Sequence, residues 1–313
     1  MTLNTVIHIG FPKTGTTTHQ NHLFSKHSQI LYLGKPYKNE NFEREMQNLI
    51  KQESTIYQSS GLKDYLDTLE IDKQLKNVLL VSDEIMVSVS KVRDKGVVAQ
   101  RLKDGFGAFT PCKVLITLRN QLDILKSTYI SGCRLLTKVQ VPKKYRGRFV
   151  DFEEWLEFSY ENLDRSHMGN FIYINTIDYY SRLFGKNNVL VLLFEEFLHH
   201  KEEYIKKLAD FLDIDRHESM ELIKTAHDNE RINQARLDFE HLVGTRFPIG
   251  KNRFISKAAT VFQFFHKIFR RDKKAKVGIP NYWMEQLKSI YGDGNRELMR
   301  KFKLPLEEYN YPL

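Results

Sequence analysis

Cysteine is scarce in this chain, and the signals typical of secreted and membrane proteins are missing. The 313 residues include 2 cysteines, Cys112 and Cys133, which provide no disulfide framework. No stretch approaches the roughly 18 to 20 consecutive apolar residues that a membrane span requires. The first apolar run leads directly into a glycine-rich turn instead of a signal-peptide cleavage site. From these absences we expect a cytoplasmic protein.

Signals of metal and nucleic-acid binding are also missing. No cluster of His, Asp and Glu has the spacing of a metal site, and no nucleic-acid-binding module or aromatic–basic signature is present. We therefore predict that the protein requires no metal and binds no nucleic acid. The chain shows no linker, internal repeat or low-complexity tract, so residues 1–313 are expected to form a single domain.

Apolar and basic residues are plentiful. Hydrophobic residues make up 41% of the chain, enough to bury a substantial core. Lys and Arg number 48 against 39 Asp and Glu, giving a formal net charge of +9. This excess favours an anionic partner. Charge alone does not distinguish a phosphate-rich cofactor from an anionic glycan or a membrane surface.

Short apolar runs predict the strands of a parallel sheet. They cover residues 5–9, 30–33, 77–81, 113–118 and 189–194. The last three are nearly continuous in apolar residues and are followed by helical stretches, which is typical of strands covered on both faces. The fold class expected is α/β, a P-loop-like doubly wound parallel sheet flanked by helices, with a helical C-terminal part. Residues 42–75 are polar and helix-permissive, and Gly61 is expected to interrupt them.

The first strand is followed by a turn suited to binding an anion. Gly10 and Gly15 allow the backbone to turn tightly, so that successive N–H groups and a helix N-terminus face one anion. Thr16 and Thr17 add hydroxyl donors, and Lys13 adds positive charge.

This turn differs from the nucleotide-kinase loop G-x-x-x-x-G-K-[ST]. The glycine spacing and Thr17 match that pattern, but Thr16 occupies the position of its lysine, and Lys13 lies earlier. A lysine at the earlier position can still reach an anion bound by the turn. A polar strand–helix turn without a ligand is the alternative.

The order Pro-Lys-Thr-Gly-Thr-Thr at residues 12–17 resembles the donor loop of sulfotransferases that use 3′-phosphoadenosine 5′-phosphosulfate (PAPS). The resemblance implies that Lys13 stabilises the leaving phosphate during catalysis. It also implies that the 5′-phosphosulfate is bound by the loop residues Lys13, Thr14, Gly15, Thr16 and Thr17.

The same family carries an arginine at the end of a central strand and a serine eight residues later, both on the 3′-phosphate. Arg119 ends the run 113–118, and Ser127 follows at that spacing. An arginine fork and a hydroxyl placed in this way can converge on one phosphate. A kinase has no need of a 3′-phosphate pocket. Taken alone, Arg119 is more often a solvated surface arginine, and Ser127 is more often an exposed helix serine.

Further segments extend the resemblance over nearly the whole chain. Residues 189–197 are similar to the family's late strand. Residues 152–156 and the tail, residues 291–312, resemble bacterial carbohydrate sulfotransferases and, more distantly, heparan-type enzymes.

Glu84 is the candidate general base. Carbohydrate branches of the family often use glutamate in this role, and Glu84 follows the strand ending at 81–83, at the edge that faces the donor loop. The alternative is a carboxylate that stabilises a helix N-terminus. Asp83 is the reserve candidate and is expected to point the other way. None of the 11 histidines is placed as well.

Two basic segments bear on partners. Residues 134–148 form either a loop that grips an anionic sugar or a solvated surface loop. Within the possible insertion 251–276, residues 254–271 place aromatic and aliphatic side chains at helical spacing beside basic ones. Such a helix either packs in the core or contacts a membrane peripherally through 254–276.

The function expected is transfer of a sulfuryl group from PAPS to a hydroxyl or amine of an acceptor, a glycan, glycolipid or small molecule. The alternatives are a nucleotide-dependent P-loop kinase and a non-catalytic anion- or membrane-binding relative.

Overall fold

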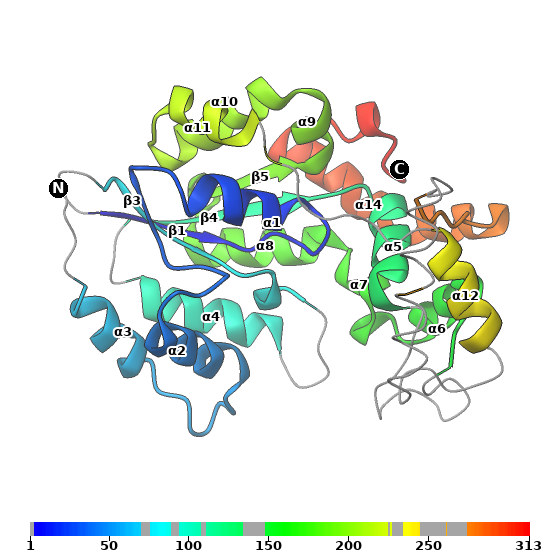
Figure 1. The fold of residues 1–313 in the computed structure, drawn as a ribbon, viewed down its shortest axis with the longest axis horizontal. Helices are drawn as coiled ribbons and strands as arrows, with labels where there is room; N and C mark the ends of the chain where they lie inside the picture. The colour runs from blue at the N-terminus through cyan, green and yellow to red at the C-terminus, as the bar shows by residue number, and fades with distance from the viewer. Residues whose placement is uncertain are drawn as a thin grey trace.

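A parallel sheet forms the centre of the structure, a computed structural model that describes residues 3–69, 76–88, 94–107, 111–133, 148–224, 226, 234–244, 261 and 274–313. The sheet has five strands in the order β2-β3-β1-β4-β5, and every pairing is parallel (Figure 1). The strands are β1 (Asn4–His8), β2 (Ile30–Tyr32), β3 (Val78–Ser82), β4 (Cys112–Leu118) and β5 (Val189–Leu193).

The three central strands, β1, β3 and β4, form where the sequence predicts them because both of their faces are buried. In β1, Val6 and Ile7 are consecutive and both fully buried, and they belong to two different hydrophobic clusters on opposite faces of the sheet. A strand covered on both sides has no polar face, so its sequence is a continuous apolar run. The α/β fold class and the helical C-terminal part are confirmed.

Helices cover both faces of the sheet (Figure 1). The helices up to the end of β4 are α1 (Thr16–Thr18), the π-helix η1 (His19–Phe24), α2 (Glu40–Lys51), α3 (Ser60–Asp67), η2 (Glu84–Met86) and α4 (Lys95–Phe106). Those between β4 and β5 are α5 (Gln121–Thr128), η3 (Tyr129–Cys133), α6 (Phe152–Glu161), η5 (Leu163–Arg165), α7 (His167–Asn170), α8 (Tyr173–Phe184) and η6 (Lys186–Asn188). After β5 follow α9 (Phe194–His199), α10 (Lys201–Leu212), α11 (Arg216–Lys224), α12 (Gln234–Gly244), α14 (Asn281–Phe302) and η8 (Glu307–Tyr309).

The two helical layers bury different clusters. Helices α2, α3, α4 and α8 pack on one face, and their cluster continues into α6, α7 and α14. Helices η1, α10 and α11 pack on the other face, where Leu23, Tyr204 and Leu208 meet Val6 and Leu115. The π-helix η1 therefore lies between the sheet and α10–α11.

One detail of the sequence prediction is wrong. Gly61 does not interrupt the helical region 42–75; it lies inside α3, and the interruption falls between the end of α2 at Lys51 and the start of α3 at Ser60. A single glycine costs a helix about 1 kcal/mol, and the burial of Leu62 and Leu66 against the core outweighs that cost.

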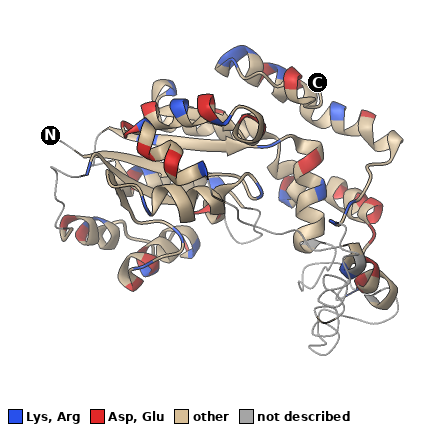
Figure 2. Cartoon of the chain, turned by 45° about the horizontal axis from the view of Figure 1, so that its top comes forward, with Lys and Arg blue, Asp and Glu red and all other residues tan. Residues whose placement is uncertain are grey.

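Charge is distributed over the helices in mixed sign. Figure 2 shows basic and acidic residues side by side on the same helices, and ion pairs such as Lys206–Glu203 and Lys288–Glu285 join residues one turn apart. Among the helices that the structure describes, none combines the length and apolar character needed to cross a bilayer.

Candidate active site at the carboxyl ends of the strands

The turn after β1 is closed so tightly that only glycine fits at position 10. A Cβ on Gly10 would lie 2.3 Å from Cγ2 of Thr16 and 2.5 Å from Oγ1 of Thr117. The hydroxyl of Thr14 donates to the carbonyl oxygen of Phe11 at 2.6 Å, which closes the turn on itself. The loop is therefore held directly over the end of β4.

Two residues of the turn adopt left-handed backbone conformations. The φ angle is 70° at Lys13 and 79° at Gly15, and α1 begins at the next residue, Thr16. The first N–H groups of a helix have no intrahelical acceptor, so those of Thr16 and Thr17 remain available to an anion. The five predicted loop residues, Lys13 to Thr17, thus lie together around one helix N-terminus.

Arg119 contacts this loop directly. Its Nη1 donates to the backbone carbonyl oxygen of Lys13 at 3.1 Å, and its guanidinium lies 5.0 Å from the ring centroid of Phe194. The same ring lies against Gly15, where an added Cβ would approach it to 3.0 Å. Ser127 lies in α5, the helix that follows β4, and is buried.

Side chains that the sequence reading missed hold the backbone around Arg119. Tyr173, the first residue of α8, donates from its hydroxyl to the carbonyl oxygen of Arg119 at 2.6 Å. The N–H of Asn120 donates to Oε1 of Glu195 at 2.9 Å, and Tyr311 donates to Oε2 of the same carboxylate at 3.0 Å. Burial raises the pKa of Glu195.

The C-terminal segment closes over the same strand end. The side-chain amide of Asn120 donates to the carbonyl oxygens of Tyr309 and Asn310, at 2.8 Å each. Asn295 on α14 donates to the carbonyl oxygen of Pro312 at 2.8 Å and contacts Gln121 in α5. The sequence signal for this set was the polar pair Glu195-Glu196, which Phe194 separates from the end of β5 at Leu193. The partners of Glu195 lie too far along the chain to be inferred.

Glu84 opens the short helix η2 at the end of β3, and its side chain is 29% exposed. Lys35 Nζ donates to its Oε1 at 3.1 Å, and Gln20 Nε2 lies 3.5 Å from its Oε2. Burial lowers the pKa of Lys35, but Asp83 and Glu84 outweigh it, so the pKa is raised. Glu84 therefore lies at the carboxyl end of β3 and at the N-terminus of η2.

Asp83 is 1% exposed, and its Oδ1 lies 3.7 Å from the same Lys35 Nζ that donates to Glu84. Its carboxylate accepts from the Tyr37 hydroxyl at 2.8 Å and from the N–H of Ile85 at 2.9 Å, which caps η2. Burial raises the pKa of Asp83. These contacts give Asp83 a structural role.

Beneath the loop lies a set of buried polar side chains, which we call the buried polar chain: Gln20, Ser82, His8, Thr117 and Thr14. Successive members lie 2.9, 2.7, 3.3 and 2.8 Å apart, and all are at most 5% exposed. Sequence reading placed His8 only as a strand residue. The sequence signal that could have revealed the buried polar chain is a polar residue at or near the carboxyl end of three strands: His8 in β1, Ser82 in β3 and Thr117 in β4.

His19 is buried beside this chain among Phe24, Phe197 and Tyr204. Its Nδ1 donates to the carbonyl oxygen of Gly15 at 2.9 Å, and its Nε2 is buried without a hydrogen-bond partner. Burial lowers the pKa of His19 to about 4.

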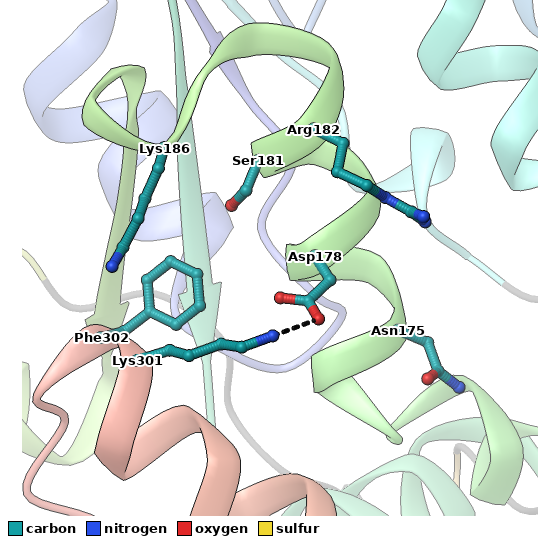
Figure 3. A pocket seen from close by; sticks show the side chains of 7 residues that line it. All are labelled: Asn175, Asp178, Ser181, Arg182, Lys186, Lys301 and Phe302. Carbon is teal, nitrogen blue, oxygen red and sulfur yellow. Dashed lines mark hydrogen bonds and ion pairs between the residues drawn. The ribbon is translucent and has the colours of Figure 1, made fainter.

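A hollow of about 570 Å³ lies between α8 and the end of α14 (Figure 3). It is bordered by α8, by the end of α14 and by η6, which leads into the amino end of β5. Lys301 in this hollow is paired with Asp178 at 2.8 Å. The hollow contains none of the predicted site residues.

The basic segments fall largely outside the described residues. Of residues 134–148 only Arg148 is described, and it is exposed. Of residues 251–276 the structure describes 261 and 274–276. Among the described side chains, no group of three or more His, Cys, Asp or Glu could hold a metal ion.

Comparison with known proteins gives a family and distant structural neighbours. The model of the sulfotransferase domain matches residues 3–260. A sulfotransferase from Alicyclobacillus acidocaldarius is 16% identical, with coverage of 86% of this chain and 96% of that chain and a TM-score of 0.45. The mouse sulfotransferase SULT7A1, complexed with PAP, is 13% identical, with coverage of 98% and 87% and a TM-score of 0.47. A search of curated proteins found no match.

Proposed function

The chain belongs to the sulfotransferase domain family, and on that premise we propose that it transfers a sulfuryl group from PAPS to a carbohydrate hydroxyl or amine. The observation that carries the proposal is the 3.1 Å hydrogen bond from Arg119 to the Lys13 carbonyl oxygen. It brings the arginine proposed for the 3′-phosphate into contact with the loop proposed for the 5′-phosphosulfate.

The residues present fit a nucleotide with two anionic groups. Thr16 and Thr17 present the first N–H groups of a helix together with their hydroxyls. Gly10 has no side chain, so the loop packs directly on Thr117 and His8. Arg119 is fixed by Phe194 and by the carbonyl oxygen of Lys13, so its fork is oriented before a ligand arrives. Together, these features support separate 5′ and 3′ subsites.

PAPS supplies an activated sulfuryl group whose departure leaves adenosine 3′,5′-bisphosphate. Lys13 is proposed to stabilise the negative charge that develops on the departing oxygen. Glu84 is proposed to accept the proton of the acceptor hydroxyl or amine. Lys35 and Gln20 fix the two oxygens of that carboxylate, so its remaining lone pairs have a defined direction.

The carbohydrate acceptor is supported by the sequence resemblance and by the basic residues of 134–148. We further propose a cytoplasmic enzyme that meets lipid-linked acceptors through peripheral membrane contact of residues 254–276. Incubation with labelled PAPS and a panel of neutral, anionic and lipid-linked glycans tests this part. Labelling of small phenols and steroids alone would contradict it.

Calorimetry without magnesium tests the donor. Adenosine 3′,5′-bisphosphate should bind, and ATP should bind poorly. Tight binding of ATP with magnesium and no binding of the bisphosphate would favour a kinase instead. Glu84→Gln should then reduce turnover by about 100-fold while leaving bisphosphate affinity unchanged. Full activity in both Glu84→Gln and Lys13→Ala would contradict the mechanism.

A further inference from the structure

The strand register brings polar side chains from three strands together. His8 is paired with Ser82 across β1 and β3, and with Leu115 across β1 and β4. Thr117 lies two residues after Leu115, on the same face, because side chains alternate along a strand. His8 is fully buried between Ser82 and Thr117, on the sheet face that η1 covers.

The direction of every hydrogen bond on the donor-loop side follows from one fixed donor. The Thr14 hydroxyl has a single hydrogen, and it donates that hydrogen to the carbonyl oxygen of Phe11, which can only accept. Thr14 therefore accepts from the hydroxyl of Thr117 at 2.8 Å. Thr117 then has no hydrogen left, so it accepts from Nε2 of His8 at 3.3 Å.

The directions of the remaining hydrogen bonds in the buried polar chain follow from the protonation state of His8. Burial, with a smaller contribution from His19, lowers the pKa of His8 to about 3, so the ring is neutral near pH 7. With its hydrogen on Nε2, Nδ1 accepts from the Ser82 hydroxyl at 2.7 Å. Ser82 in turn accepts from the amide of Gln20 at 2.9 Å, and the same amide nitrogen lies 3.5 Å from Glu84.

We propose that His8 is a positioning residue whose two ring nitrogens tie the Glu84 carboxylate and the donor loop into one rigid unit. The role in turnover rests on the function proposed above. Nδ1 fixes the acceptor side through Ser82 and Gln20, and Nε2 fixes the donor side through Thr117 and Thr14. A single imidazole thereby sets the relative position of the base and the phosphosulfate loop.

The hydrogen bonds on the two sides of His8 can be removed separately. We call those through Ser82 and Gln20 the acceptor arm, and those through Thr117 and Thr14 the donor arm. Ser82→Ala removes the acceptor arm and should lower kcat about tenfold, because small displacements of a reacting group are costly, while affinity for adenosine 3′,5′-bisphosphate stays within about twofold. Thr117→Val removes the donor arm and should weaken bisphosphate binding about tenfold, since the loop loses its support.

Substitution of His8 itself provides the matched pair. The amide of asparagine can replace Nδ1, and that of glutamine can replace Nε2. His8→Asn should therefore behave like Thr117→Val, and His8→Gln should behave like Ser82→Ala. Urea unfolding of each variant separates these effects from loss of folding. If both His8 variants change kcat and bisphosphate affinity in the same proportion, the proposal is wrong.

A readout independent of activity is the histidine tautomer. Long-range ¹H–¹⁵N spectra of histidine-labelled protein should show His8 protonated on Nε2 and His19 protonated on Nδ1, with peaks assigned by their loss in His8→Asn and His19→Leu. Protonation of His8 on Nδ1 would overturn the proposal even in an active enzyme. If the tautomers are as expected but Glu84→Gln keeps full turnover, the base assignment fails and the link through Ser82 to catalysis fails with it.

Discussion

Arg119 donates to the backbone carbonyl oxygen of Lys13 across 106 positions of sequence, at a distance of 3.1 Å. The contact joins the first loop of the chain to the end of β4. Because the acceptor is a backbone atom, it orients the guanidinium without neutralising its charge.

The first prediction separates the two proposed phosphate subsites. Arg119→Met should weaken binding of adenosine 3′,5′-bisphosphate by about 10- to 100-fold, the loss expected for a charge-assisted hydrogen bond. Binding of adenosine 5′-monophosphate, which lacks the 3′-phosphate, should change less than about threefold on the same principle. Calorimetry with both nucleotides measures the difference. Arg182→Met, at an exposed position on α8, is the control, and equal losses for both ligands would contradict the assignment.

The second prediction concerns Gly10. Gly10→Ala would place a methyl group 2.5 Å from Thr117 Oγ1 and 2.8 Å from His8 Nε2, both fully buried. Overpacking of this kind should lower the free energy of unfolding by about 3 kcal/mol or more. Urea unfolding measures it, with Gly278→Ala as control because an added Cβ there meets nothing within 4 Å. Equal stability of the two variants would show that the turn can relax.

The third prediction is a pH dependence of stability. The pKa of His8 is lowered to about 3 and that of His19 to about 4, against 6.5 in the unfolded chain. The unfolded state therefore binds more protons below pH 6.5, so each residue stabilises the fold above that pH. Each should destabilise it by about 1.4 kcal/mol per pH unit as the pH falls from 6.5 toward its own folded pKa.

Urea unfolding of wild type and His19→Leu between pH 7.5 and 5 measures this contribution. The variant should show a shallower loss of stability with falling pH. Asp83 and Glu195, whose pKa values are raised, titrate in the opposite sense, and their contributions cancel in the comparison. His217→Leu, at an exposed site on α11, controls for removal of one histidine. Parallel curves for wild type and His19→Leu would contradict the prediction.

The fourth prediction concerns the buried carboxylate of Glu195. Tyr311→Phe removes the hydroxyl that donates to its Oε2 at 3.0 Å. An unsatisfied buried acceptor should lower the free energy of unfolding by about 1–3 kcal/mol. Tyr309→Phe is the matched control, because Tyr309 contacts Asn120 through its backbone carbonyl. Similar unfolding curves for both variants would show that water replaces the lost donor.

The central strands could be predicted because burial on both faces requires a nearly continuous run of apolar residues. The runs 113–118 and 189–194 differ from β4 and β5 by a single residue at one end. The loop could be predicted because its residues are contiguous. Arg119 and Ser127 were placed by a family spacing, whereas nothing local in the sequence indicates that Arg119 bonds to the Lys13 carbonyl oxygen.

The supporting residues could not be predicted, because their partners are distant in sequence. Asn120 meets Glu195 75 residues later and Tyr309 189 residues later, and no periodicity encodes such pairs. His8 was read as an ordinary strand residue, since a lone histidine in an apolar run does not reveal a serine and a threonine on neighbouring strands. The wrong prediction of a helix interruption at Gly61 has the same origin, because packing of α3 against distant residues outweighed the low helix propensity of glycine.

The docking of Tyr309 and Asn310 on the side chain of Asn120 has a consequence for biosynthesis. The turn after β1 and the strand β4 are made before α14, and the backbone groups that close over Asn120 follow α14. In a nascent chain, the side-chain amide of Asn120 therefore lacks its two carbonyl acceptors until Tyr309 and Asn310 have been made. A chain stopped before residue 309 would contain the whole sheet but would lack the two carbonyl acceptors of the Asn120 amide beside Arg119.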